Sequence, residues 1–108
     1  MYSCIDNKSY GNLIYSHKDG TDFVNIYSNG WCEQGGSNTF EANTLVNLLH
    51  PFKDTNYGVV ATPSSSNNSN SNYSAAVGSR TTSQFNLSYS NNTTGNSVNF
   101  WRAYGYVF

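Results

Sequence analysis

The chain has 108 residues and a formal net charge of −1, and only 10% of its residues are charged, compared with about 25% in an average soluble domain. Its length predicts a single domain, and its low charge leaves no basic stripe to neutralise phosphates, so we expect no nucleic-acid binding. No apolar stretch reaches the ~18 residues that span a bilayer, and no signal-peptide pattern follows Met1, so we expect neither membrane insertion nor a secretory leader.

The amino-terminal part of the chain is predicted to alternate strands with turns. Residues 10–17 and 22–28 have the composition of strands, and Lys18-Asp19-Gly20 between them is typical of a turn. Asn29-Gly30 then predicts a two-residue hairpin of type I′, because that turn needs positive φ at both central positions.

Glycines and a proline limit the elements that follow. Residues 31–34 predict a short strand, which Gly35-Gly36 is expected to close as a second turn or a bulge. Residues 44–49 form an apolar run that is too short for a helix and is cut off by Pro51.

The second half of the chain has the composition of an antiparallel β protein. A strand is expected at 57–62, with Tyr57, Val59 and Ala61 on one face, and residues 63–72, almost pure Ser and Asn, are expected to form a loop. Three further strands are predicted at residues 73–79, 83–90 and 97–108. Short strands at roughly 8–12-residue spacing with polar turns predict an all-β fold, an antiparallel β-sandwich.

Aromatic residues are the clearest clue to function in the composition. Nine Tyr, six Phe and two Trp exceed what one small sandwich core can bury, so some should lie at a subunit interface or on a binding surface. Trp31 and Trp101 are assigned to the core, because each lies within a predicted central strand. Alternation is clean in two of the later strands: Phe85, Leu87 and Tyr89 face one way, as do Val98, Phe100, Arg102 and Tyr104.

No combination of residues indicates catalysis. Glu33 lies on the same strand face as Trp31, but glycoside hydrolysis needs a second carboxylate within reach, and most other acids fall in predicted turns. His17 and His50 form no His-x-His pair, and no Gly-x-Ser-x-Gly elbow occurs. We therefore predict no enzyme activity, no metal and no cofactor, and we interpret Glu33 as structural.

Three motifs resemble the distal tip domains of bacteriophage tail fibres. They are Ser-Asn-Gly-Trp-Cys-Glu-Gln-Gly-Gly at 28–36, Pro-Phe-Lys-Asp-Thr-Asn-Tyr at 51–57 and Trp-Arg-Ala-Tyr-Gly-Tyr at 101–106. The resemblance runs from about Phe23 onward, and it implies a tip domain at 21–108 with residues 1–20 as a possible link to an upstream fibre shaft. The motif positions that it marks as structural are Asn29, Gly30, Trp31, Glu33, Gly35, Trp101, Gly105 and Tyr106.

The same resemblance implies an assembly and a place in the virion. Such domains are carboxy-terminal β-sandwiches that form homotrimers at the distal end of the tail fibre, outside the cell. Cys4 and Cys32 could pair in a disulfide or remain free as buried thiols. The resemblance favours free thiols, because phage structural proteins assemble in the reducing cytosol.

The function implied is adhesion without catalysis to a host cell-surface receptor, a glycan or a protein. Loops at one end of the sandwich are expected to carry weak contacts, which three copies would strengthen. The alternatives are a purely structural trimerising cap and an accessory carbohydrate-binding module of a phage depolymerase. The candidate receptor-binding residues are Asn67, Asn68, Asn70, Asn72, Tyr73, Arg80, Asn91 and Asn92.

Overall fold

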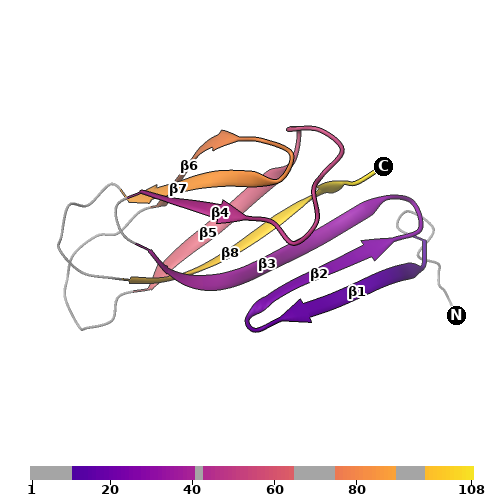
Figure 1. Cartoon of the computed structure of the whole chain (residues 1–108), viewed down its shortest axis with the longest axis horizontal. Helices are drawn as coiled ribbons and strands as arrows, with labels where there is room; N and C mark the ends of the chain where they lie inside the picture. Colours follow the sequence, from indigo (N-terminus) through magenta and orange to yellow (C-terminus); the bar gives the residue numbers. More distant parts are fainter. Residues whose placement is uncertain (1–10, 41–42, 65–74, 90–96) are drawn as a thin grey trace, which may run out of the picture.

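The computed structural model describes residues 11–40, 43–64, 75–89 and 97–108, and these residues form eight strands (Figure 1). The strands are β1 (Leu13–Asp19), β2 (Asp22–Tyr27), β3 (Trp31–Phe40), β4 (Asn43–Asn47), β5 (Gly58–Ser64), β6 (Ala75–Arg80), β7 (Gln84–Tyr89) and β8 (Ser97–Tyr106). Within the described parts of the chain, no helix has the length and apolar character needed to cross a membrane.

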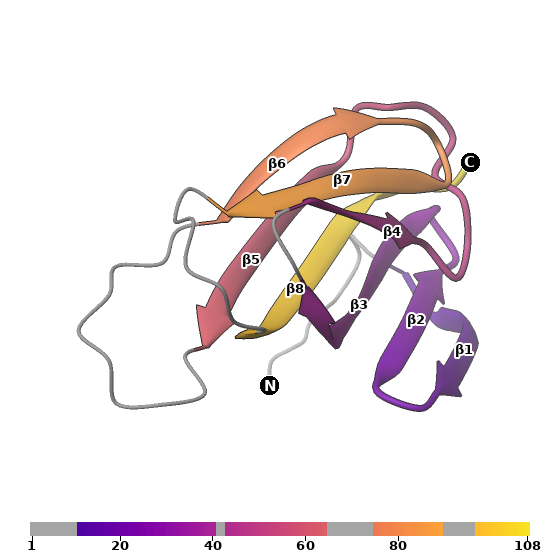
Figure 2. The ribbon, with the colours of Figure 1, turned by 60° about the vertical axis from the view of Figure 1, so that its left-hand side comes forward.

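The strands form two antiparallel sheets, which confirms the predicted fold class. The large sheet has the order β1-β2-β3-β8-β5, and the small sheet has the order β4-β7-β6. The small sheet packs over β3, β8 and β5, whereas β1 and β2 extend beyond it (Figures 1 and 2). The predicted strands at 22–28, 57–62, 73–79, 83–90 and 97–108 are all present, with ends that shift by a few residues.

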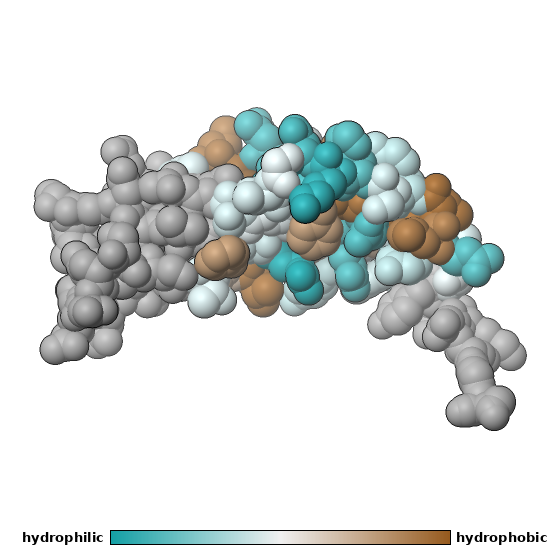
Figure 3. Space-filling view, turned by 90° about the horizontal axis from the view of Figure 1, so that it is seen from below, coloured by the Kyte–Doolittle hydropathy of each residue, from teal (hydrophilic) through white to brown (hydrophobic). Residues whose placement is uncertain are grey.

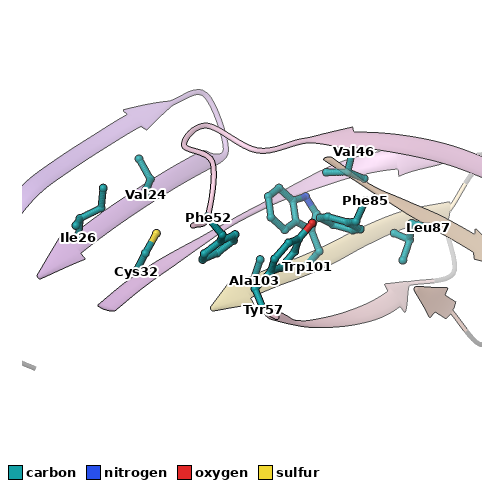
Figure 4. Close-up of a cluster of buried hydrophobic side chains, with 10 residues drawn as sticks. All are labelled: Val24, Ile26, Cys32, Val46, Phe52, Tyr57, Phe85, Leu87, Trp101 and Ala103. Atoms are coloured by element: carbon teal, nitrogen blue, oxygen red, sulfur yellow. The ribbon is translucent and has the colours of Figure 1, made fainter. Parts of the chain in front are cut away.

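The core lies between the sheets and follows the period-two alternation of the strands (Figure 4). Phe85 and Leu87 of β7 face Trp101 and Ala103 of β8, and the Phe85 and Trp101 rings meet edge to face with centroids 5.3 Å apart. Trp101 is 4% exposed, which confirms its assignment to the core. Val59 and Ala61 pack on this core from the face of β5 on which they were expected to lie with Tyr57.

The three sequence motifs meet in one structural unit. Gln34 is fully buried, and its side-chain amide binds the segment before Pro51: Nε2 donates to the carbonyl of His50 at 2.8 Å, and Oε1 accepts from the amide of Leu49 at 3.0 Å. The Phe52 and Tyr57 rings stack with centroids 4.4 Å apart. A side chain at Gly105 would lie 2.9 Å from the Tyr57 Cβ, so the stack fits only because Gly105 has none.

The Asn29-Gly30 turn differs from the predicted type I′ hairpin. The Gly30 amide donates to the Tyr27 carbonyl at 2.8 Å, so Ser28 and Asn29 occupy the central positions, and Gly30 follows with φ of +93°. β2 ends at Tyr27 and β3 begins at Trp31, so the loop has three residues instead of two, and this register pairs Ile26 with Cys32, both facing the core. The connection is therefore a three-residue loop that ends on a left-handed glycine, and the Asn29 side chain stabilises it by accepting from the Trp31 amide at 2.9 Å.

Gly35 and Gly36 do not end a strand, which corrects the second turn prediction. They lie inside β3, which continues to Phe40 and pairs with β8 along its whole length. A Cβ at Gly35 would lie 2.5 Å from the Trp101 carbonyl oxygen, and one at Gly36 would collide with the Asp22 carboxylate. These glycines allow a close approach between strands, a requirement that composition does not distinguish from a turn.

The segment at 44–49 and Cys32 can also be compared with their predictions. The apolar run at 44–49 is largely a strand, β4, whose Val46 faces the core. Cys32 is a buried, free thiol, as expected, and burial raises the pKa of this thiol to about 11; Cys4 lies outside the described residues.

Candidate functional site

The large sheet has a second face, pointing away from the core, on which side chains stay exposed or half-buried. We call it the outer face. Strand pairing aligns its residues in rows that cross the sheet. Four rows follow from the register, and together they give this face an aromatic and cationic character.

The first row carries the positive charge of the outer face. It runs through Lys18 in β1, Phe23 in β2, Gly35 in β3, Arg102 in β8 and Val60 in β5, each paired with the next. The Arg102 guanidinium carbon lies 5.5 Å from the centre of the Phe23 ring. Since Gly35 separates the two residues and has no side chain, Arg102 can lean across β3 onto Phe23.

A groove of 540 Å³ lies beside this row. The neighbouring row of the outer face also lines the groove. In this row Phe100 pairs with Ser37 of β3 and with Thr62 of β5. Thr21 closes the groove near the β1–β2 turn, where its hydroxyl donates to the Ser37 carbonyl at 3.0 Å. The described lining of the groove therefore includes two cationic residues, three aromatic residues and three hydroxyl residues.

The other two rows hold an aromatic cluster of Trp31, Tyr104 and Tyr106. The Trp31 ring centroid lies 6.2 Å from that of Tyr104 and 5.4 Å from that of Tyr106, and its indole Nε1 donates to Glu33 at 3.2 Å. The tyrosines keep 38% and 42% of their surface exposed. The cluster presents aromatic side chains to solvent in a fixed arrangement.

The structure corrects the assignment of Trp31 to the core. β3 is the central strand of the large sheet, but Cys32 and Gln34 are the residues that face inward. Alternation then places Trp31 and Glu33 on the outer face, where Trp31 is half-buried. A central position in a sheet does not decide which face a residue occupies.

Of the candidate receptor-binding residues, only Arg80 lies among the residues that the structure describes. Asn67, Asn68, Asn70, Asn72, Tyr73, Asn91 and Asn92 lie outside the described residues. The strand ends that flank them lie together at one end of the sandwich, because Ser64 pairs with Val98 and Ala75 pairs with Tyr89. Thr62 and Phe100 of the groove are close to this end.

Arg80 is not brought together with those loops. It lies at the other end of β6, where it pairs with Phe85, and its guanidinium carbon is 5.9 Å from the centre of the Tyr57 ring. Arg80 therefore lies at the opposite end of β6 from Ala75, where the strand that follows the 63–72 segment begins.

A second surface is apolar and lies where β1 begins and the chain ends. We call it the apolar end; it consists of Leu13, Ile14, Tyr15 and Phe108, each about half exposed or more. Three of these residues, Ile14, Tyr15 and Phe108, line a hollow of 460 Å³ together with Ile26, His50 and Val107. Hydrophobic side chains gather at this end of the molecule (right-hand side of Figure 3).

The acidic and metal-binding side chains of the described residues are not gathered into a metal site. No group of three or more His, Cys, Asp or Glu side chains in the described ranges is arranged to hold a metal ion. Burial, with a smaller contribution from Asp19, raises the pKa of Asp22, whose Oδ1 is buried and has no hydrogen-bond partner in the described parts of the chain. The absence of catalysis, cofactor and metal stays a prediction.

Sequence reasoning missed the groove residues Lys18, Phe23 and Arg102. Alternation correctly placed Phe100, Arg102 and Tyr104 on one face of a strand, but it did not show which strands lie beside it. β3 pairs with β8 across more than half of the chain. Gly35 is the residue from which the groove could have been predicted. A glycine within a strand leaves space on the face of the sheet, but Gly35 was expected to lie in a turn or a bulge.

Comparison with known proteins gives a likeness of fold. No family model matches the sequence, and no curated protein sequence matches it significantly. A solved structure of an N-truncated R2-type pyocin tail fibre is similar, with a TM-score of 0.69 and 19% identity over 91% of this chain and 39% of that chain. The carboxy-terminal part of an R2 pyocin fibre of P. aeruginosa gives a TM-score of 0.68 and 19% identity over 85% of this chain and 26% of that chain.

This chain thus spans well under half the length of the fibre chains it matches. At this level of identity the likeness concerns the fold. The chain has an antiparallel β-sandwich fold that also occurs in R2-type pyocin tail fibres.

Proposed function

We propose that this chain is a tail-fibre domain at the distal, extracellular end of a virion, and that it binds a glycan on the host cell surface without catalysis. The fold shared with pyocin tail fibres supports the fibre context. The observation that carries the binding function is the outer face, with its exposed aromatic cluster and its adjoining groove.

The chemistry of this face suits a sugar. A Tyr or Trp ring offers a flat apolar surface to the C–H groups of a sugar ring, and its polar tip remains available for hydrogen bonding. Trp31 is held by Glu33 and flanked by both tyrosines, so the aromatic surface is ordered before a ligand arrives. Such pre-organisation lowers the entropy cost of binding.

We assign the apolar end to contacts between copies of the chain in a homotrimer. Exposed Leu13, Ile14, Tyr15 and Phe108 form an uncharged surface, which is typical of the centre of a subunit interface. β1 is also an edge strand of the large sheet, and an upstream fibre shaft would enter near its start. The assembly would leave three copies of the outer face free for binding.

The candidate loops extend this proposal. The candidate residues Asn67 to Tyr73, Asn91 and Asn92 stay part of the proposal, because the described strands that flank them end close to Thr62 and Phe100. Each single contact would be weak, on the order of millimolar, and three copies on one fibre would raise the overall affinity.

The test is a glycan array with the purified domain and two matched variants. Tyr104→Ala removes an exposed ring from the outer face. Leu45→Ala removes an apolar side chain of comparable exposure, 55%, from the small sheet. We expect Tyr104→Ala to lose binding and Leu45→Ala to keep it.

Two outcomes would contradict the proposal. Equal glycan binding by both variants would show that the ligand binds outside the outer face. A domain that binds no array glycan and adsorbs to no cell, yet forms trimers, would instead be the structural cap.

A further inference from the structure

We propose that the groove on the outer face selects an anionic sugar unit, and that Lys18 and Arg102 recognise its charge. This inference rests on the proposed glycan-binding function and specifies the ligand class. It concerns a carboxylated or a phosphorylated sugar, because both present the same anionic oxygens to a cation.

The first observation is that the fold brings the two cations onto one row. Lys18 and Arg102 are separated by 84 positions in the sequence (102 − 18), and β1, β2, β3 and β8 align them through Phe23 and Gly35. The Arg102 guanidinium lies over the Phe23 ring, the residue that pairs with Lys18 in this row.

The second observation is that this charge is not neutralised. The chain contains five Lys and Arg residues, and two of them line the groove, whereas no carboxylate among the described residues does. Neither Lys18 nor Arg102 forms an ion pair within the described part of the chain; the described contact of Arg102 is with the Phe23 ring. Two unpaired cations in one hollow favour a negatively charged ligand.

The third observation is that the remaining lining suits the rest of a sugar. Thr21, Ser37 and Thr62 supply hydroxyls, and Phe100, 55% exposed, supplies an aromatic surface. The volume of 540 Å³ falls within the range of roughly 300–1,000 Å³ found for small-molecule sites. A simple anion would leave most of this lining unused, so a sugar that carries the anion fits better.

Arg102 is the residue expected to give geometric specificity. Its planar guanidinium can form two parallel hydrogen bonds with a carboxylate or a phosphate, and its contact with the Phe23 ring, 5.5 Å from the ring centre, keeps it beside the groove. Lys18 adds a flexible point charge from the edge strand.

The experiment is a chemical-shift titration of the isotopically labelled domain with paired probes. Tetragalacturonate is compared with its methyl ester, which has the same backbone without charge, and mannose 6-phosphate is compared with mannose. We expect at least one acidic probe to bind about tenfold more tightly than its neutral partner, with shifts at Phe23, Ser37 and Arg102. The stronger of the two acidic probes identifies carboxylate or phosphate as the group recognised.

Variants show whether the named cations cause the preference. Arg102→Gln and Lys18→Gln should each weaken acidic-probe binding about threefold to tenfold. Lys53→Gln removes the same charge outside the groove, where Lys53 lies 5.9 Å from the centre of the Tyr106 ring, and should change acidic-probe affinity less than about twofold. Dispersed amide spectra of each variant confirm that it is folded.

Three results would overturn the inference. Equal affinity for the acidic and neutral probes would leave glycan binding intact and exclude charge selection. A loss in Lys53→Gln as large as that in Arg102→Gln would show a general charge effect. Binding of none of the probes by a domain that still binds glycans on the array would place the site outside the groove, whereas failure on the array as well would overturn the proposed function itself.

Discussion

Asp22 lies in β2 at a position where its partly buried carboxylate lowers the stability of the fold. Its carboxylate is placed against Gly36, which has no side chain to displace it, and one oxygen is buried without a hydrogen-bond partner in the described part of the chain. Burial raises the pKa of Asp22, and Asp19 raises it further. A buried polar group without a partner usually costs stability, and a site that retains one often has another role.

The raised pKa predicts how stability depends on pH. The folded protein holds the Asp22 proton at a higher pH than the unfolded chain does, so this residue reduces stability as pH rises through its folded pKa. Asp22→Asn should therefore melt at a higher temperature than the wild type at pH 7, and the difference should close towards pH 3. Asp19→Asn should give a smaller gain, because Asp19 is the lesser cause of the shift. An Asp22→Asn variant that is less stable than the wild type at pH 7 would contradict this account.

Strand alternation accounts for the different environments of the two tryptophans. Trp101 points into the core beside Phe85, whereas Trp31 lies on the outer face beside Tyr104 and Tyr106. Both belong to neighbouring strands of the same sheet. The stability of the sandwich should therefore depend on the first, and its surface chemistry should depend on the second.

This difference can be measured with one pair of substitutions. Trp101→Ala should lower the free energy of unfolding by about 3–5 kcal/mol, because it leaves a cavity in the core. Trp31→Ala should cost about 1–2 kcal/mol, since it removes ring contacts on an exposed face. Urea denaturation of both variants gives the comparison, and equal losses would show that Trp31 is a core residue after all.

The strands were more predictable from the sequence than their pairing. Alternation in Phe85-Leu87 and in Trp101-Ala103 is local and marks a buried face directly. The continuation of β3 through Gly35 and Gly36 depends on two contacts outside this segment. One is with β8, which is distant in the sequence, and the other is with Asp22 of β2. The groove depends on the register between β1, β2, β3 and β8, so no local pattern could predict it.

At the scale of the whole molecule, the two proposed roles fall on two different described surfaces. The apolar end gathers exposed Ile14, Tyr15 and Phe108, and the outer face carries the aromatic cluster and the groove. The small sheet presents a mainly polar exterior, with a hydrogen bond between Gln84 and Asn47. Assembly through the first surface and binding through the second are compatible in one fibre.

The assembly predicts a definite mass in solution. Light scattering of the domain at micromolar concentration should give three times the mass of one chain. Ile14→Asp places a charge in the apolar end and should yield monomers, because burying an unpaired carboxylate is unfavourable. Leu45→Asp puts the same charge on the small sheet and should leave the trimer intact. A monomeric wild-type domain would contradict the assignment of the apolar end.

The central claim is that the outer face of the large sheet is the glycan-binding surface. Its most direct test is chemical-shift mapping of the domain with whichever glycan binds most strongly on the array. The account predicts that the largest shifts fall on outward residues of β2, β3 and β8, including Phe23, Glu33, Arg102 and Tyr104. Shifts confined to the small sheet, at Leu45 and Asn86, would contradict it.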